Sequence, residues 1–268
     1  MTLFQSFLLG ILQGLTEFIP VSSTAHLLIA QHFMGLDPEN AAYFSFSVLV
    51  QLGTLVSLFA FYWRDLLAIA RATLDFQHPT AERDLGFYII IATIPALIAG
   101  FLLKDKVEEL FKQPMLEASI RLFSAAILLI LAEWLTKKKR GLDSMNWLDA
   151  LFIGVMQILS IFPGASRSGT TISAGMYRGF DRPAAARFAF LMSIPVMLAA
   201  GAYQVLDLVT MPGMQLTSFL PLLAVGFITA AIVGWFAIKW LIDYLSRRSL
   251  YVFAIYCAVV GAIVFFLR

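Results

Sequence analysis

A stretch near the start of the chain, "GLTEFIPVSSTAH" (14–26), gathers side chains that could do chemistry. It places Glu17, Ser23 and His26 within ten residues, with Pro20 between the carboxylate and the hydroxyl. A hydroxyl nucleophile, an imidazole base and an orienting carboxylate are the groups of covalent and acid–base catalysis. We expect Pro20 to end one helix and the serines to cap the next, because proline breaks helices and serine is a favoured N-cap.

A second stretch, "FPGASRSGTT" (162–171), surrounds Arg167 with hydroxyls and glycines. A guanidinium donates parallel hydrogen bonds to a tetrahedral oxyanion, and the free amides of a helix N-terminus attract the same group. The pattern therefore predicts a phosphate site. Candidate phosphate-binding residues in the two stretches are Gln13, Ser22, Thr24, Ser166, Ser168, Gly169, Thr170 and Thr171. A structural role stays open for the hydroxyls, which often bond their own backbone, and for a Glu17–Arg167 ion pair.

The chain as a whole is too apolar for a soluble protein. Of its 268 residues, 60% are hydrophobic and 13% are charged, so we predict an all-α integral membrane protein. A net charge of +2 argues against nucleic-acid binding, and we find no zinc, Walker or dinucleotide pattern. The single Cys257 excludes a disulfide framework. Six segments are long enough to span a bilayer: 43–63, 85–103, 116–135, 184–207, 217–240 and 250–267.

Basic residues predict the orientation of these transmembrane helices. The loops that contain 137–140 and 247–248 are basic, and the positive-inside rule places them in the cytoplasm. By alternation, a loop over 64–84 also lies in the cytoplasm, whereas the loops at 35–40 and 210–218 lie outside.

Two segments, 1–36 and 145–183, must then begin and end on the same side of the membrane. A proline interrupts each, so we predict two re-entrant helical hairpins, the first entered from outside and the second from the cytoplasm. Three spans follow each hairpin, which divides this single membrane domain into an inverted repeat of about 1–136 and 141–268. Matching sequences support the division: "GILQ" (10–13) with "GVMQ" (154–157), and "IPVSS" (19–23) with "FPGAS" (162–166).

The two stretches together resemble the signature motifs of a known family. "QGLTEFIPVSSTAH" (13–26) and "PGASRSGTT" (163–171) look like those of the undecaprenyl-diphosphate phosphatases, bacterial membrane enzymes linked to bacitracin resistance. The resemblance implies a hydrolase that removes the terminal phosphate of undecaprenyl diphosphate and so recycles the lipid carrier of peptidoglycan and other envelope polymers. It also implies a divalent cation, Mg²⁺ or Ca²⁺, and an active site at the outer face of the cytoplasmic membrane.

The resemblance also assigns roles to individual residues. The family's essential histidine and arginine and its motif serines fall on His26, Arg167, Ser23 and Ser166. Its first motif carries Glu or Gln followed four residues later by Glu, which here are Gln13 and Glu17. Glutamine at the first position removes one carboxylate and leaves Glu17 as the candidate metal ligand.

Two reaction schemes remain open. Either Ser23 attacks the terminal phosphoryl group with His26 as base, or His26 attacks directly while Glu17 orients its ring. In both schemes Arg167 stabilises the phosphate charge. A lipid-phosphate transporter or flippase is the alternative class, since inverted repeats with broken helices are typical of transporters. A transporter needs no nucleophile beside a base, so the pattern favours an enzyme acting on a polyprenyl diphosphate lipid. A homodimer is left open by the sequence.

Overall fold

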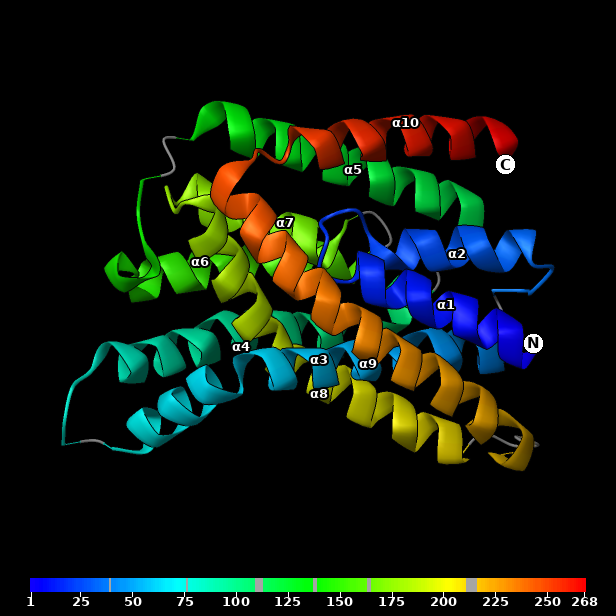
Figure 1. Ribbon diagram of the computed structural model, residues 1–268, viewed down its shortest axis with the longest axis horizontal. Helices are drawn as coiled ribbons and strands as arrows, with labels where there is room; N and C mark the ends of the chain where they lie inside the picture. The colour runs from blue at the N-terminus through cyan, green and yellow to red at the C-terminus, as the bar shows by residue number, and fades with distance from the viewer. Residues whose placement is uncertain (39, 76, 109–112, 137–138, 163–164, 211–215) are drawn as a thin grey trace.

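The protein is a bundle of α-helices in the computed structural model (Figure 1). The structure describes residues 1–38, 40–75, 77–108 (backbone alone from 104), 113–136, 139–162, 165–210 and 216–268. Within these residues the helices are α1 (Leu3–Thr16), α2 (Ser23–Phe33), α3 (Ala41–Leu74), α4 (Ala81–Glu108), α5 (Pro114–Leu135), α6 (Trp147–Gln157), α7 (Arg167–Tyr177), α8 (Arg182–Thr210), α9 (Leu216–Arg247) and α10 (Tyr251–Leu267). Short 3₁₀ turns at Leu142–Ser144 and Ile158–Ile161 precede and follow α6.

Five of these helices, α3, α4, α5, α8 and α9, are long and apolar enough to cross a membrane. The predicted sixth span is α10, a shorter apolar helix of 17 residues. The surface of α9 exposes Ile228, Ile232 and Phe236 by 57%, 57% and 61%, at the spacing of one helix face. A continuous apolar face of this kind suits lipid and not water. The protein is therefore a multi-pass membrane protein.

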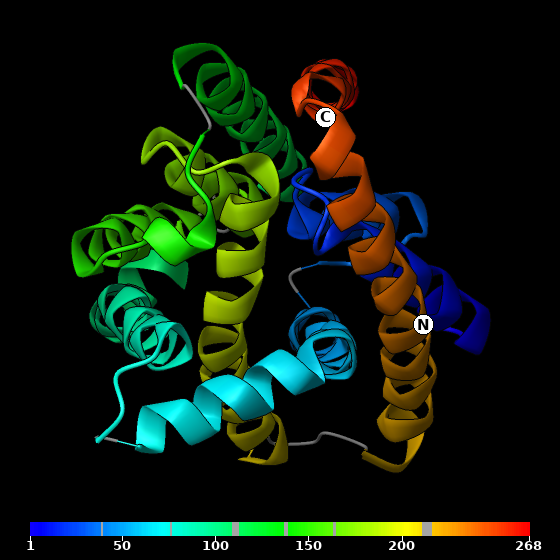
Figure 2. The ribbon, with the colours of Figure 1, turned by 60° about the vertical axis from the view of Figure 1, so that its left-hand side comes forward.

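Helix α3 extends well beyond the span predicted for it. Its 34 residues give a length of about 50 Å, against a hydrocarbon core of roughly 30 Å. The backbone kinks at Tyr62 (φ −102°, ψ 18°), and Figure 2 shows the last turns leaving the bundle at an angle. The predicted loop over 64–84 is therefore wrong, because its first part continues α3 and its last residues begin α4; the described residues between these helices are 75 and 77–80. The arginines there raise polarity without ending the helix, since arginine is a good helix former.

Each predicted hairpin region contains two short helices. In the first, α1 packs against α2, and in the second, α6 packs against α7. The predicted break at Pro163 lies outside the described residues, as do Lys137 and Lys138 of the basic loop. The turn between α1 and α2 lies in the middle of the bundle, whereas both chain termini lie at one end of it (Figure 1).

Each hairpin packs against a long helix from the other half of the chain. Helix α1 lies along α9, and α6 lies along α4 (Figures 1 and 2). A Cβ on Gly10 would lie 2.6 Å from the carbonyl oxygen of Gly226, and a Cβ on Gly154 would lie 2.4 Å from that of Ala92. Only glycine allows such close backbone approach. The paired "GILQ" and "GVMQ" sequences thus contain the glycine that each hairpin uses to seat on its neighbour.

Buried carboxylates hold together the end of the bundle that carries the basic loops. Asp149 is fully buried and binds Nη2 of Arg140 and Nε of Arg178, each at 2.6 Å. Glu133 binds Arg182 through two hydrogen bonds of 2.7 Å and accepts a third from the Leu250 amide. Bidentate, charge-assisted contacts of this kind fix geometry. They tie α6 to the end of α7, and α5 to the starts of α8 and α10.

Candidate functional site

The turn between α1 and α2 positions the first set of polar residues. Glu17 is the C-cap of α1, and Ser22 is the N-cap of α2, with its Oγ accepting from the Ala25 amide at 3.4 Å. This confirms that a serine caps the second helix. Ser22 is also the one described non-glycine residue with positive φ (φ 69°, ψ 91°). Backbone strain of that kind is concentrated at functional sites.

The Glu17 carboxylate is the centre of the site and is almost fully buried. Its Oε2 accepts hydrogen bonds from Gln13 Nε2 at 2.6 Å and from Ser23 Oγ at 2.7 Å. Its Oε1 forms an ion pair with Nη2 of Arg167. One carboxylate therefore joins the end of α1, the start of α2 and the start of α7. Gln13 and Glu17 share one face of α1, as their spacing predicts.

The second hairpin presents the N-terminus of α7 to this carboxylate. Ser166 is the N-cap of α7, and its Oγ accepts from the Gly169 amide at 3.2 Å. Ser168 Oγ lies 3.4 Å from Ser166 Oγ and 3.4 Å from the Ile19 carbonyl oxygen in the first turn. The start of α7 is thus in direct contact with the turn between α1 and α2. A helix N-terminus beside a guanidinium is a favourable place for a phosphate.

His26 is buried beside the same turn, but its hydrogen bonds go elsewhere. Its Nδ1 lies 2.8 Å from the Ser22 carbonyl oxygen, and its Nε2 lies 2.8 Å from the Tyr256 hydroxyl of α10. The expectation that Glu17 orients this ring is wrong, because both ring nitrogens have other partners. Among the described contacts, Ser23 bonds Glu17 and not His26.

The remaining predicted phosphate-binding residues divide between the site and the helix interior. Thr24 lies half-buried in the first turn of α2. Thr171 bonds the carbonyl oxygen of Arg167 in its own helix at 2.9 Å, which is the structural alternative for a hydroxyl. Thr170 is fully buried, and its hydroxyl finds no partner within the described parts of the chain.

Sequence reasoning missed a buried arginine next to the site. Arg121 of α5 forms an ion pair with Glu117 at 2.7 Å, and its Nη1 donates to the Ala165 carbonyl oxygen at 3.0 Å. Ala165 immediately precedes the cap of α7. The signal was available, because Glu117 and Arg121 are two charges four residues apart inside a predicted span. Tyr256 was also missed, and an isolated tyrosine in an apolar helix gives no signal.

The donor set at the site fits a hard divalent cation that is shared with a substrate. Among the described residues, no three His, Cys, Asp or Glu side chains cluster as a metal cage. Glu17 supplies carboxylate oxygens, and Oε1 of Gln13 is buried without a hydrogen-bond partner in the described residues. Mg²⁺ and Ca²⁺ take such oxygen ligands, and Mg²⁺ is often completed by phosphate oxygens. Glu17 and Gln13 are thus the residues that could hold a cation.

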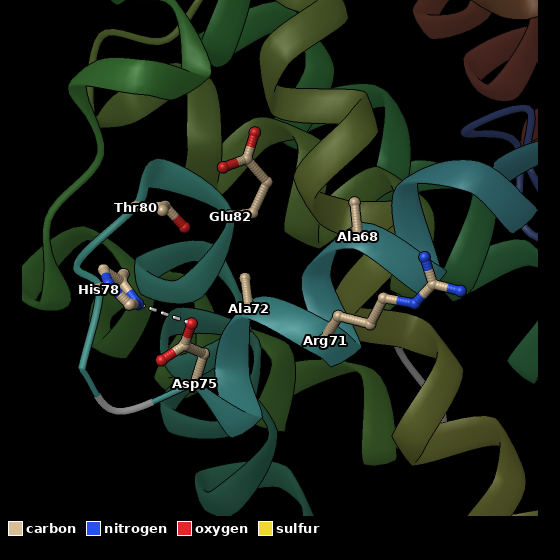
Figure 3. A pocket seen from close by; sticks show the side chains of 7 residues that line it. All are labelled: Ala68, Arg71, Ala72, Asp75, His78, Thr80 and Glu82. Carbon is tan, nitrogen blue, oxygen red and sulfur yellow. Dashed lines mark hydrogen bonds and ion pairs between the residues drawn. The ribbon is translucent and has the colours of Figure 1, made fainter.

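A separate pocket of about 310 Å³ lies at the connection between α3 and α4 (Figure 3). Figure 3 shows Asp75 and His78 at its edge, joined by a hydrogen bond of 3.0 Å, with Arg71 pointing away from them. None of its lining residues belongs to the candidate site. The pocket is therefore distinct from the Glu17–Arg167 contact.

Fold and site together define a class of protein. It is a multi-pass helical membrane protein in which two broken helices bring a carboxylate, a serine and an arginine together at a site suited to phosphate. The family described as "Bacitracin resistance protein BacA" matches the chain over residues 6–263. The chain therefore belongs to this family.

Relatives named undecaprenyl-diphosphatase align along nearly the whole chain. The protein of Chloroherpeton thalassium is 38% identical, with 97% of this chain and 95% of the relative covered. That of Methanobrevibacter smithii is 38% identical over 99% and 97% of the two chains. That of Mycobacterium marinum is 39% identical over 100% and 95%. These proteins are similar to this chain in length as well as in sequence.

Proposed function

We propose that this protein hydrolyses undecaprenyl diphosphate to undecaprenyl phosphate and inorganic phosphate. The observation that carries the proposal is the Glu17 carboxylate, which contacts both Ser23 and Arg167. The Ser23 hydroxyl, as nucleophile, contacts one oxygen of this buried carboxylate, and the phosphate-binding guanidinium of Arg167 contacts the other. The family and the names of the relatives support the same activity. Recycling of the lipid carrier would sustain cell-wall synthesis and give resistance to bacitracin.

The start of α7 would bind the terminal phosphate. Arg167 supplies a permanent charge, and the free amides at the N-terminus of α7 supply hydrogen bonds that are already oriented. Phosphoryl transfer depends chiefly on positioning and on charge stabilisation, and this arrangement serves both. The lipid tail would extend into the bilayer between the helices.

We assign the nucleophile to Ser23. Its Oγ donates to Glu17 at 2.7 Å, so the carboxylate is placed to accept the serine proton as the oxygen attacks phosphorus. The bond from phosphorus to the bridging oxygen then breaks, and the lipid monophosphate leaves. In the second step water attacks the phosphoserine and His26 Nε2 accepts a proton from that water. The bond from Ser23 Oγ to phosphorus breaks, Glu17 returns to Ser23 the proton that it accepted in the first step, inorganic phosphate leaves, and His26 releases its proton to solvent.

A divalent cation held by Glu17 and Gln13 would supply further neutralisation of the diphosphate charge. Because Glu17 is the one carboxylate among these two residues, the substrate itself would complete the set of ligands around the cation. Removal of divalent cations should therefore weaken the binding of the diphosphate more than it weakens the fold.

We further propose that the chain is an inverted repeat whose hairpins are re-entrant, with α10 as its sixth span and the site open to the outside of the bacterial cytoplasmic membrane. Two features support this arrangement. Helix α1 packs on α9 as α6 packs on α4, while α3 meets α8 and α5 meets α10. If each helix of the first half is exchanged for its counterpart in the second half, the α1–α9 pair becomes the α6–α4 pair, and the α3–α8 and α5–α10 pairs stay the same. The basic loops also gather at the end opposite the chain termini (Figure 1).

The activity is tested by phosphate release from undecaprenyl diphosphate by the purified, folded protein, with and without Mg²⁺ or Ca²⁺. Release that requires the cation supports the proposal. If folded protein releases no phosphate in either condition, the proposal fails, and movement of lipid phosphate across sealed vesicles becomes the next assay. That second assay addresses the flippase alternative directly.

The nucleophile is tested by trapping a phosphoenzyme with labelled substrate. We expect an acid-stable adduct on Ser23 that is absent from Ser23→Ala. An acid-labile adduct on His26 would instead make the histidine the nucleophile. Ser246→Ala serves as the matched control, because Ser246 lies near the end of α9, where its hydroxyl bonds the Asp243 carbonyl oxygen of its own helix.

Access from outside is tested with Thr24→Cys in a Cys257→Ala background. The native Cys257 is fully buried, and its replacement leaves one reactive thiol. An impermeant thiol reagent added to intact cells should label Thr24→Cys. Labelling only after the cytoplasmic side is exposed would contradict the proposed orientation.

A further inference from the structure

Helix α10 reaches the proposed catalytic histidine directly. The hydroxyl of Tyr256 lies 2.8 Å from His26 Nε2, although the two residues are 230 positions apart. The next residue, Cys257, is buried and contacts the Pro20 carbonyl oxygen at 3.9 Å. Two consecutive residues of α10 therefore contact the first turn, which makes this helix part of the surroundings of the site.

The hydrogen bonds of His26 determine where its proton lies. A carbonyl oxygen can only accept, so Nδ1 must donate its proton to the Ser22 carbonyl oxygen at 2.8 Å. In the neutral ring Nε2 then carries a lone pair, and the Tyr256 hydroxyl must be the donor. The two ring planes lie within 6° of each other, with centroids 5.7 Å apart. The imidazole is thus held at both nitrogens by groups from different parts of the chain.

We propose that Tyr256 is a positioning residue of the phosphatase reaction. Its hydroxyl keeps the His26 ring in one orientation, with Nδ1 bound to the Ser22 carbonyl oxygen and the Nε2 lone pair directed at the place that the hydroxyl fills and that the attacking water would take. Tyr256 is 44% exposed, so its side chain has room to turn aside when water takes over the hydrogen bond. The inference rests on the proposed role of His26 in the hydrolytic step.

A purely structural role for this hydrogen bond makes different predictions. If it only tied α10 to α2, its loss would lower stability and leave turnover by the folded protein unchanged. If it positions the imidazole, its loss lowers kcat with little effect on KM, because the substrate contacts lie on the Arg167 side. The split between kcat and KM therefore separates the two roles.

The test is Tyr256→Phe, which removes only the hydroxyl, with Tyr251→Phe on the same helix as the control. We expect kcat to fall about two- to tenfold for Tyr256→Phe, the range that one neutral hydrogen bond supplies, with KM retained. In protein with His32→Gln and His78→Gln, ¹⁵N spectra report His26 alone. The Nε2 resonance should move downfield in Tyr256→Phe and stay in place in Tyr251→Phe.

An unchanged kcat, or an Nε2 resonance that does not move, would overturn the role of Tyr256. His26→Ala is measured in parallel, so that the two proposals fail separately. Full activity of His26→Ala would remove the proposed role of His26 and this inference with it. Loss of activity in His26→Ala together with full activity in Tyr256→Phe would remove only the inference.

Discussion

The buried ion pair between Glu117 and Arg121 makes a quantitative prediction about stability. The two side chains are 5% and 6% exposed, and their closest N–O distance is 2.7 Å. Arg121→Met leaves the Glu117 carboxylate buried without its main cation, which costs about 3–5 kcal/mol. Protonation of the carboxyl limits the cost, so we expect roughly 3 kcal/mol. Glu117→Met leaves the guanidinium buried in the same way, with a similar expected loss.

The double variant should recover most of this stability. Replacing both charges with methionine removes the desolvation penalty together with the attraction, and buried pairs exchanged for apolar side chains are often neutral or better. Of the contacts described above, the hydrogen bond from Arg121 to the Ala165 carbonyl oxygen is lost without replacement, which costs roughly 1.5 kcal/mol. The losses of the two single variants sum to about 6 kcal/mol and the double variant loses about 1.5 kcal/mol, so the expected coupling energy is about 4.5 kcal/mol.

The assay is SDS-induced unfolding in mixed micelles for the wild type, both single variants and the double variant. Arg247→Met is the control, since Arg247 and Asp243 form an exposed pair, 74% and 68% accessible. We expect its effect to stay within about 0.5 kcal/mol. A double variant that loses the sum of the two single losses would refute the reasoning, because the charges would then not be compensating each other.

Two further predictions concern packing and titration. Gly10→Ala should destabilise the protein by about 1–3 kcal/mol through overpacking against the Gly226 backbone. Gly100→Ala should stabilise it by up to ~1 kcal/mol, because a Cβ there meets nothing within 4 Å. Equal changes in the free energy of unfolding of the two variants, measured in the same assay, would contradict this. The hydrogen bond from His78 lowers the pKa of the exposed Asp75 carboxyl below its ordinary value. The small stabilisation that this hydrogen bond gives the folded protein is therefore present above the ordinary pKa of the carboxyl and is lost as the pH falls through the lowered pKa. His78→Ala should return the Asp75 pKa toward its ordinary value in a ¹³C carboxyl titration, and an unchanged midpoint would show that the hydrogen bond is not the cause.

Hydropathy and helix signals predicted the elements well, because lipid imposes length and helicity on every crossing segment. The caps at Ser22 and Ser166 were predictable from residue type, since serine satisfies the free amides at a helix start. The arginines at the end of α3 misled the prediction of its loop. They end the apolar stretch of the sequence, whereas the helix continues to Leu74.

The partners of the site residues were only partly predictable. Spacing placed Gln13 beside Glu17, because residues four apart lie on one helix face. No local pattern shows that Ser23 bonds Glu17 or that Tyr256 bonds His26. Those contacts depend on the strained conformation of the Ser22 turn and on a helix from the far end of the chain, which only the tertiary structure brings together.

The central claim is that the two hairpins form one phosphatase site at Glu17, and one comparison tests it most directly. Phosphate release from undecaprenyl diphosphate is measured for the wild type, Arg167→Ala, Glu17→Gln and the control Arg187→Ala. Arg187 lies outside the site and forms an ion pair with Asp65, with an N–O distance of 3.1 Å. The account predicts that folded Arg167→Ala and Glu17→Gln each lose at least roughly 100-fold in kcat/KM, while Arg187→Ala keeps its activity. If either site variant retains activity within about tenfold of the wild type, the two hairpins do not share one catalytic site.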